Sequence, residues 1–189
     1  MFNFTISMKS FSNHFLISMP HMDDPIFTKS LIYICENNSE GSLGIIINKP
    51  IVSKNAADII EQTGLENIKP SFDIYFGGPV QVDRGFVLHL DHNYSTDTQK
   101  VNEFISITAS RDIIQSIASE GRPETSIITL GFAGWSAGQI ESEIKQNSWL
   151  TVPCDESLVF HTPSDDLWKV AASTIGVDVS LLVNEAGNA

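Results

Sequence analysis

The sequence is short of cysteine and of long apolar runs, and each shortage excludes a class of protein. Only Cys35 and Cys154 occur in 189 residues, far apart in the chain. Two distant cysteines do not form a disulfide framework, and a chain of this length buries a sufficient core without one. No apolar run approaches the roughly 20 residues that span a bilayer, and the N-terminus lacks the pattern of a signal peptide. The sequence therefore predicts a cytoplasmic protein without a membrane segment.

Basic residues are also scarce. Eleven Lys and Arg stand against 23 Asp and Glu, which gives a net charge of −12. Affinity for nucleic acid comes largely from basic side chains that displace counterions, so direct binding to DNA or RNA is disfavoured. A local basic patch stays an open alternative, because net charge says nothing about how the charges are distributed.

Short strand and helix patterns predict one α+β domain over residues 1–189. β-Branched and aromatic runs indicate strands, and 30–36 with 42–50 form a hairpin whose strands are covered on both faces. Further strands are predicted at 72–80, 85–90, 103–108 and 126–133, and the segments WLTVP and SLVF form a last strand pair. Helices are predicted at 55–64, at 111–121 and after 134. A final helix has Thr162 as N-cap and Pro163 as its first residue.

Three long stretches carry a family resemblance: residues 15–50, 76–89 and 130–150, with a weaker tail over 157–178. The most specific pattern is Gly134-Trp135 followed by Gly-Gln-Ile-Glu. Together they resemble the bacterial AlgH/YqgE family, apart from Asn37 and Asn188, which stand where histidines are expected, and residues 1–12, which lie outside the match. The resemblance implies a mixed, partly curled sheet flanked by helices and a regulatory role, and it supplies no catalytic residues.

Residues 134–138, GWSAG, match the G-x-S-x-G pattern of a hydrolase nucleophile, with a strand predicted before it and a helix after it. Asp155 and His161 follow in the order of a catalytic triad. In such an enzyme His161 deprotonates Ser136, Asp155 orients the imidazole, and the amide of Ala137 stabilises the oxyanion.

A structural interpretation of the same segment is favoured. Ser136 and Gln139 have the spacing of a capping box, in which the serine accepts from the Gln139 amide and the glutamine reaches back. Glycines around them permit a tight turn, and Asp155 and His161 follow Ser136 too closely for the hydrolase layout. We therefore predict that Ser136 serves the helix.

A ligand cleft is predicted between the glycine turns at 77–79 and 134–139. Arg84 either pairs with Asp83 or binds a carboxylate or phosphate. A helix N-terminus at 136–139 also suits a small anion. The predicted binding residues are Gly77, Gly78, Arg84, Gly134, Trp135, Ser136, Gly138 and Gln139.

No metal or cofactor is predicted. His89, Asp91 and His92 offer too few ligands for a metal site, and His89 is expected to be hydrogen-bonded at a strand end. Cys35 is expected to be an inert buried thiol, and acidic neighbours should raise the pKa of Cys154.

The leading hypothesis is a non-catalytic protein that binds a small ligand or a protein partner in a regulatory role. Two alternatives stay open: a serine hydrolase that uses Ser136, and a regulator that binds DNA directly.

Overall fold

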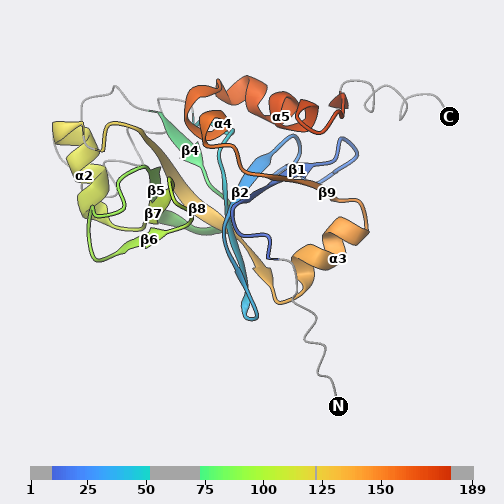
Figure 1. Ribbon diagram of the computed structural model, residues 1–189, viewed down its shortest axis with the longest axis horizontal. Coiled ribbons are helices and arrows are strands. Elements are labelled where there is room, and N and C mark those ends of the chain that lie inside the picture. The colour runs from blue at the N-terminus through green and yellow to red at the C-terminus, as the bar shows by residue number, and fades with distance from the viewer. Residues whose placement is uncertain (1–9, 52–72, 122, 180–189) are drawn as a thin grey trace, which may run out of the picture.

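The computed structural model of the protein describes residues 10–51, 73–121 and 123–179, so the helix predicted at 55–64 lies outside the described residues. The strands are β1 His14–Ser18, β2 Leu31–Asn38, β3 Gly41–Ile46, β4 Ile74–Phe76, β5 Val80–His89, β6 Thr98–Lys100, β7 Ser106–Thr108, β8 Ser126–Ser136 and β9 Trp149–Pro153. The helices are α2 Arg111–Glu120, α3 Gln139–Lys145, α4 Glu156–His161 and α5 Ser164–Ser173. In the described residues the strands β1 to β7 precede α2, strands and helices then alternate, and α4 and α5 end the series (Figure 1).

The strands form one mixed sheet in the order β6-β7-β5-β8-β3-β2-β1-β9, with β4 paired to β8 off this path. The β4–β8 pair is parallel, and the other pairs of named strands are antiparallel. The sheet curls, and helices flank it, so the predicted α+β architecture is confirmed. The predicted hairpin is also confirmed, as β2 and β3.

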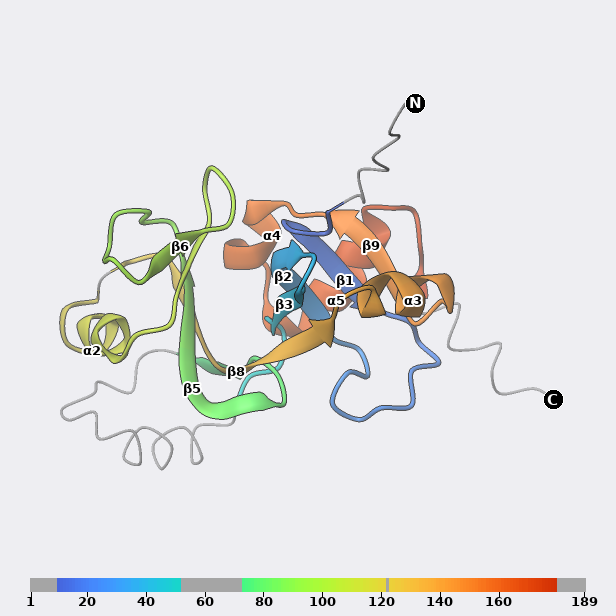
Figure 2. The same cartoon turned by 90° about the horizontal axis from the view of Figure 1, so that it is seen from below.

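Strand β8 joins the two parts of the sheet (Figure 2). Its first half pairs with β4 and β5, and its second half pairs with β3. Gly131 lies between the halves at φ 72°, a backbone conformation that glycine adopts far more easily than other residues. A side chain there would overlap the carbonyl oxygen of Gly78, so the crossing depends on glycine.

Both faces of β2 are buried, as predicted. Tyr33 lies in the same apolar cluster as Trp168 of α5, whereas Ile32 lies on the other face in a cluster with Ile140 of α3. This arrangement arises because successive side chains of a strand point to opposite faces. Burying both faces makes β2 the middle of a layered structure.

Helix α2 agrees with the sequence prediction. The Ser110 side chain accepts from the backbone amide of Asp112, and the helix ends at Gly121 in the left-handed conformation. Ile113 and Ile114 are buried in a cluster with residues of β5 and β8. No described helix is both long and apolar enough to cross a bilayer.

The prediction that SLVF is a strand is wrong, because these residues belong to α4. Asp155 accepts hydrogen bonds from the backbone amide and the hydroxyl of Ser157, at 2.9 and 2.7 Å, and so caps the helix. An N-cap of this kind outweighs the strand propensity of a short apolar run.

The predicted start of the last helix is also wrong. Thr162 is the C-cap of α4, and α5 begins at Ser164 with Pro163 as its N-cap and no capping side chain. A residue before proline is driven out of the helical region, and Thr162 is extended at φ −94° and ψ 131°. Pro163 therefore separates two helices.

Candidate functional site

The glycine–tryptophan corner, residues 134–138, begins inside a strand that extends further than the sequence predicts. Strand β8 continues to Ser136, which pairs with Gly41 of β3. Helix α3 begins only at Gln139, after Gly138 at φ 76°. Ser136 is thus the exposed last residue of a paired strand, two residues before the N-cap of the helix.

Half of the predicted capping box is present. The backbone amide of Ser136 donates to Oε1 of Gln139 at 3.0 Å, which confirms that the glutamine reaches back. The predicted bond from the Ser136 hydroxyl is wrong, because the N-cap is Gly138 and no side chain caps α3. Strand pairing with Gly41 holds the serine outside the helix.

The structure does not bring Ser136 and His161 together. Ser136 pairs with Gly41 at the tip of the β2–β3 hairpin, and Phe160 of α4 lines a cavity with Ile47, beyond the other end of β3. Six residues of strand span about 20 Å. Figure 1 likewise shows the hairpin tip at the bottom of the view and α4 near the top. Asp155, the third member of the predicted triad, is occupied in capping α4.

A different serine and histidine do meet. The Ser106 hydroxyl lies 2.6 Å from Nδ1 of His92, whose Nε2 lies 2.6 Å from the carbonyl oxygen of Glu103. This contact has the form of a nucleophile and its base. However, Ser106 has no exposed surface, so a substrate cannot reach it, and the pair braces the segment before β7.

Glu143 is a central residue of the corner that sequence reasoning missed. Its Oε2 accepts from the indole N–H groups of Trp135 at 3.0 Å and Trp149 at 2.8 Å. Its Oε1 accepts from the side-chain amide of Gln139 at 2.8 Å. Both tryptophans are buried, at 7% and 3% exposure. The carboxylate thereby ties α3 to β8 and β9.

The second glycine turn packs directly on β8. The Gly77 amide donates to the Leu130 carbonyl at 2.8 Å, and the Gly77 carbonyl accepts from Ile46 at 2.9 Å. A side chain at Gly78 would overlap the backbone of Phe132. The turn is therefore in direct backbone contact with β8 at residues 130–132.

Two β-bulges occur in strands that are far apart in the sequence. In β2, Ile34 faces Gly44 but Glu36 faces Leu43, which leaves Cys35 as an extra residue. In β5, residues 81–84 all lie opposite Gly131 of β8. Bulges redirect side chains and are common beside functional sites.

Both bulges border one cavity of about 500 Å³. We call it the bulge groove. Its polar side chains are Glu36, Gln81, Arg84, Asp97 and Gln99, and its aromatic wall is formed by Phe86 and Phe132. The lining combines several polar and charged side chains with an aromatic wall. A hollow of this size lies within the range of small-molecule sites.

Arg84 is the one predicted binding residue among those that line the bulge groove. The Nη1 of Arg84 donates to Oε1 of Gln81 at 3.2 Å, across the bulge. The guanidinium carbon lies 5.3 Å from the centre of the Phe86 ring. These contacts place the guanidinium beside Gln81 and over the Phe86 ring. Since it carries five N–H donors, donors remain for a ligand.

Cys35 contributes a neutral thiol to the wall of the bulge groove. Its side chain is buried, and burial is the main cause that raises the pKa of the thiol, with a smaller contribution from Cys154. Burial and then Glu156 likewise raise the pKa of Cys154. The predicted direction for Cys154 is confirmed, with burial as the larger cause and its acidic neighbours as the smaller one.

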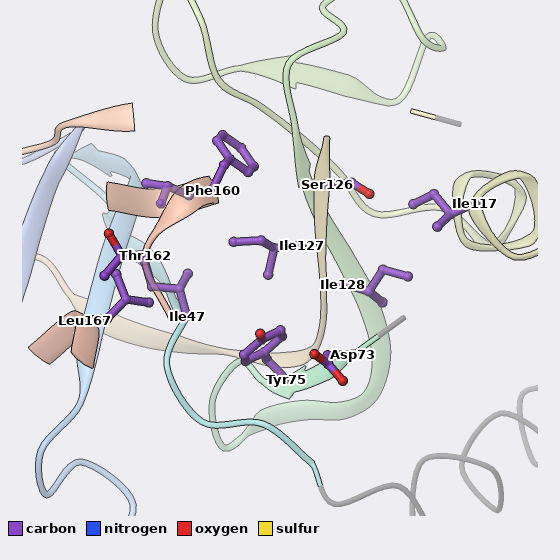
Figure 3. A pocket seen from close by; sticks show the side chains of 11 residues that line it. Ile47, Asp73, Tyr75, Ile117, Ser126, Ile127, Ile128, Phe160, Thr162 and Leu167 are labelled. Atoms are coloured by element: carbon purple, nitrogen blue, oxygen red, sulfur yellow. The ribbon is translucent and has the colours of Figure 1, made fainter. Parts of the chain in front are cut away.

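A second cavity, of about 250 Å³, lies between α4 and β8 (Figure 3). Ile47, Ile127 and Phe160 form apolar walls, and Asp73 and Tyr75 lie along one side. Burial raises the pKa of Tyr75, so the phenol stays neutral. Among the described residues that line this cavity, the charged side chain is the carboxylate of Asp73. The described lining therefore offers no cation to an anionic ligand.

Comparison with known proteins gives consistent relatives. A family model described as AlgH-like (DUF179) matches residues 15–180. A UPF0301 protein of Saccharophagus degradans is 44% identical over 95% of this chain and 89% of its own length, and one of Pseudoalteromonas translucida is 43% identical over 96% and 100%. The solution structure of the AlgH protein from Pseudomonas aeruginosa is 41% identical, with a TM-score of 0.77 over 97% of this chain and 98% of that one. The crystal structure of DIP2367 from Corynebacterium diphtheriae shares the fold at 17% identity, with a TM-score of 0.69 over 92% of each chain.

Proposed function

This chain belongs to the AlgH-like family, and we propose that it is a non-catalytic binding protein whose site is the bulge groove. The observation that carries the proposal is the convergence of two bulges, from β2 and β5, on one cavity. A binding protein that catalyses no reaction can exert an effect only through whether its site holds the ligand. This is consistent with a regulatory role.

The chemistry of the lining supports binding over catalysis. Arg84 can donate to a carboxylate or phosphate in the bidentate geometry that guanidinium groups favour. Phe86 and Phe132 meet edge to face, with ring centroids 5.5 Å apart, and present an apolar wall. Cys35, the thiol in this wall, is held in its protonated form by burial. These groups can recognise and orient a ligand, but they supply no activated nucleophile.

The test is an NMR titration of the full chain with benzoate, a small carboxylate with an apolar ring. We expect amide shifts confined to residues of the bulge groove. Charged hydrogen bonds contribute about 1.5–3 kcal/mol, so Arg84→Gln should weaken binding by about 10- to 100-fold.

Arg111→Gln is the matched control, because Arg111 is an exposed arginine at the start of α2 that does not line the bulge groove. This variant should bind benzoate as the unaltered protein does. Shifts that map to another region, or an affinity unchanged by Arg84→Gln, would overturn the proposed function.

A further inference from the structure

The charges around the bulge groove restrict what it can hold. Arg84 supplies one cation, and Glu36 and Asp97 supply two carboxylates. A ligand with several negative charges, such as a nucleotide, would meet both carboxylates and a molecule of net charge −12. A purely cationic ligand would leave the guanidinium without an anionic partner. A ligand with one charge of each sign satisfies both kinds of group.

The carboxylates lie on both sides of Arg84. Glu36 belongs to β2, which is three strand spacings from β5 through β3 and β8, whereas Asp97 immediately precedes β6 on the other side. Three spacings amount to about 14 Å along a flat sheet, and the curl of this sheet shortens the path through space. This is a spacing between strand backbones, and the side chains of Arg84, Glu36 and Asp97 all line the one cavity, so a single small molecule can contact charges of both signs.

An apolar wall lines the same cavity as the charged groups. The Phe86 ring lies under the guanidinium and contacts Phe132, and Leu43 and Ile107 continue the lining. Aromatic side chains give a large apolar surface on which a ligand's own ring or alkyl group can pack. The third requirement on the ligand is thus an apolar body.

Resting on the proposed function, we infer that the bulge groove binds a small zwitterion with an apolar body, the class of an apolar α-amino acid or a short apolar peptide. Arg84 binds the carboxylate, Glu36 or Asp97 binds the ammonium group, and the apolar body lies on Phe86 and Phe132.

The experiment compares three ligands that share one ring: phenylalanine, 3-phenylpropionate, which lacks the ammonium group, and phenethylamine, which lacks the carboxylate. Binding to the full chain is measured by NMR titration. Phenylalanine should bind at least about tenfold more tightly than either analogue, since each lacks one charged contact. This comparison needs no variant, so it does not depend on whether a substitution disturbs folding.

Variants then assign each contact. Arg84→Gln should weaken phenylalanine and 3-phenylpropionate but leave phenethylamine unchanged. The double variant Glu36→Gln, Asp97→Asn should weaken phenylalanine and phenethylamine but leave 3-phenylpropionate unchanged. Arg111→Gln should alter none of the three, and the dipeptide Phe-Phe, run alongside, distinguishes a peptide from a free amino acid as the tighter ligand.

The outcomes separate the two proposals. Equal affinity for phenylalanine and 3-phenylpropionate, with Arg84-dependent shifts in the bulge groove, would refute the zwitterion and leave the binding site intact. If neither these ligands nor benzoate shift residues of the groove, the proposed function itself fails.

Discussion

Glu143 holds three side-chain donors with one carboxylate, at the point where β8, α3 and β9 meet. Glu143→Ala leaves the buried indole N–H groups of Trp135 and Trp149 without acceptors. Unsatisfied buried donors are costly, and we expect the free energy of unfolding to fall by about 2–4 kcal/mol. Urea denaturation measures this change. Glu141→Ala in the same helix is the control and should cost less than about 1 kcal/mol; equal effects would show that the contacts to Glu143 are unimportant.

Ser136 has the sequence context of a nucleophile but not the surroundings of one. With His161 beyond the opposite end of β3, nothing in the described corner deprotonates its hydroxyl. We expect a fluorophosphonate probe to give the same labelling for the unaltered protein and for Ser136→Ala, and neither to hydrolyse a generic ester. Labelling that disappears in the variant would make the protein a serine enzyme.

His89 links stability to pH. It is fully buried, its Nε2 lies 2.7 Å from Oγ1 of Thr108, and burial lowers its pKa against the opposing charge of Asp91. The unfolded state, with a histidine pKa of about 6.5, therefore binds protons that the folded state rejects. The contribution of His89 to stability is complete above about pH 6.5 and is lost as pH falls toward the lowered pKa.

The measurement is urea denaturation at several pH values between about 7.5 and 5. His89→Gln should flatten the decline in unfolding free energy on the acid side, because it removes the titrating group. His161→Gln, at an exposed position on α4, should retain the decline. A steeper decline in His89→Gln than in the unaltered protein would show that the sign is wrong.

At the scale of elements, β8 must bend where it passes from β5 to β3, and Gly131 permits this bend. Gly131→Ala adds left-handed strain and a clash with the carbonyl of Gly78, so we expect a loss of about 3 kcal/mol or more. Gly121→Ala is the matched control, because Gly121 has φ 70° but open space around it, and it should cost about 1 kcal/mol. Similar losses in urea denaturation would mean that close packing at Gly131 is unimportant.

At the scale of the whole molecule, charge decides between classes of partner. A net charge of −12 opposes the phosphate backbone, so we expect no gel shift with duplex DNA at low or at high salt. A retarded band at low salt that disappears at high salt would instead reveal a local basic patch. Single-stranded RNA serves as a second probe in the same assay.

The sequence by itself determined the features that depend on neighbouring residues. β-Branched and aromatic runs identified the β2–β3 hairpin, a helical pattern identified α2, and an apolar setting identified Cys35 as a buried thiol. Two predictions failed because another interaction outweighed the local pattern on which they relied. The strand propensity of SLVF was outweighed by the Asp155 cap, which makes the segment a helix. The capping pattern of Ser136 was outweighed by strand pairing, so its hydroxyl does not cap α3.

Only the tertiary structure decided where the candidate site lies. Glu36 and Arg84 belong to different strands, and neither has a local pattern that marks it as a partner of the other. They line one cavity because β3 and β8 run between their strands, the sheet curls, and a bulge in each strand redirects the side chains. Strand order and register are set by packing over the whole sheet, and local periodicity carries no information about either.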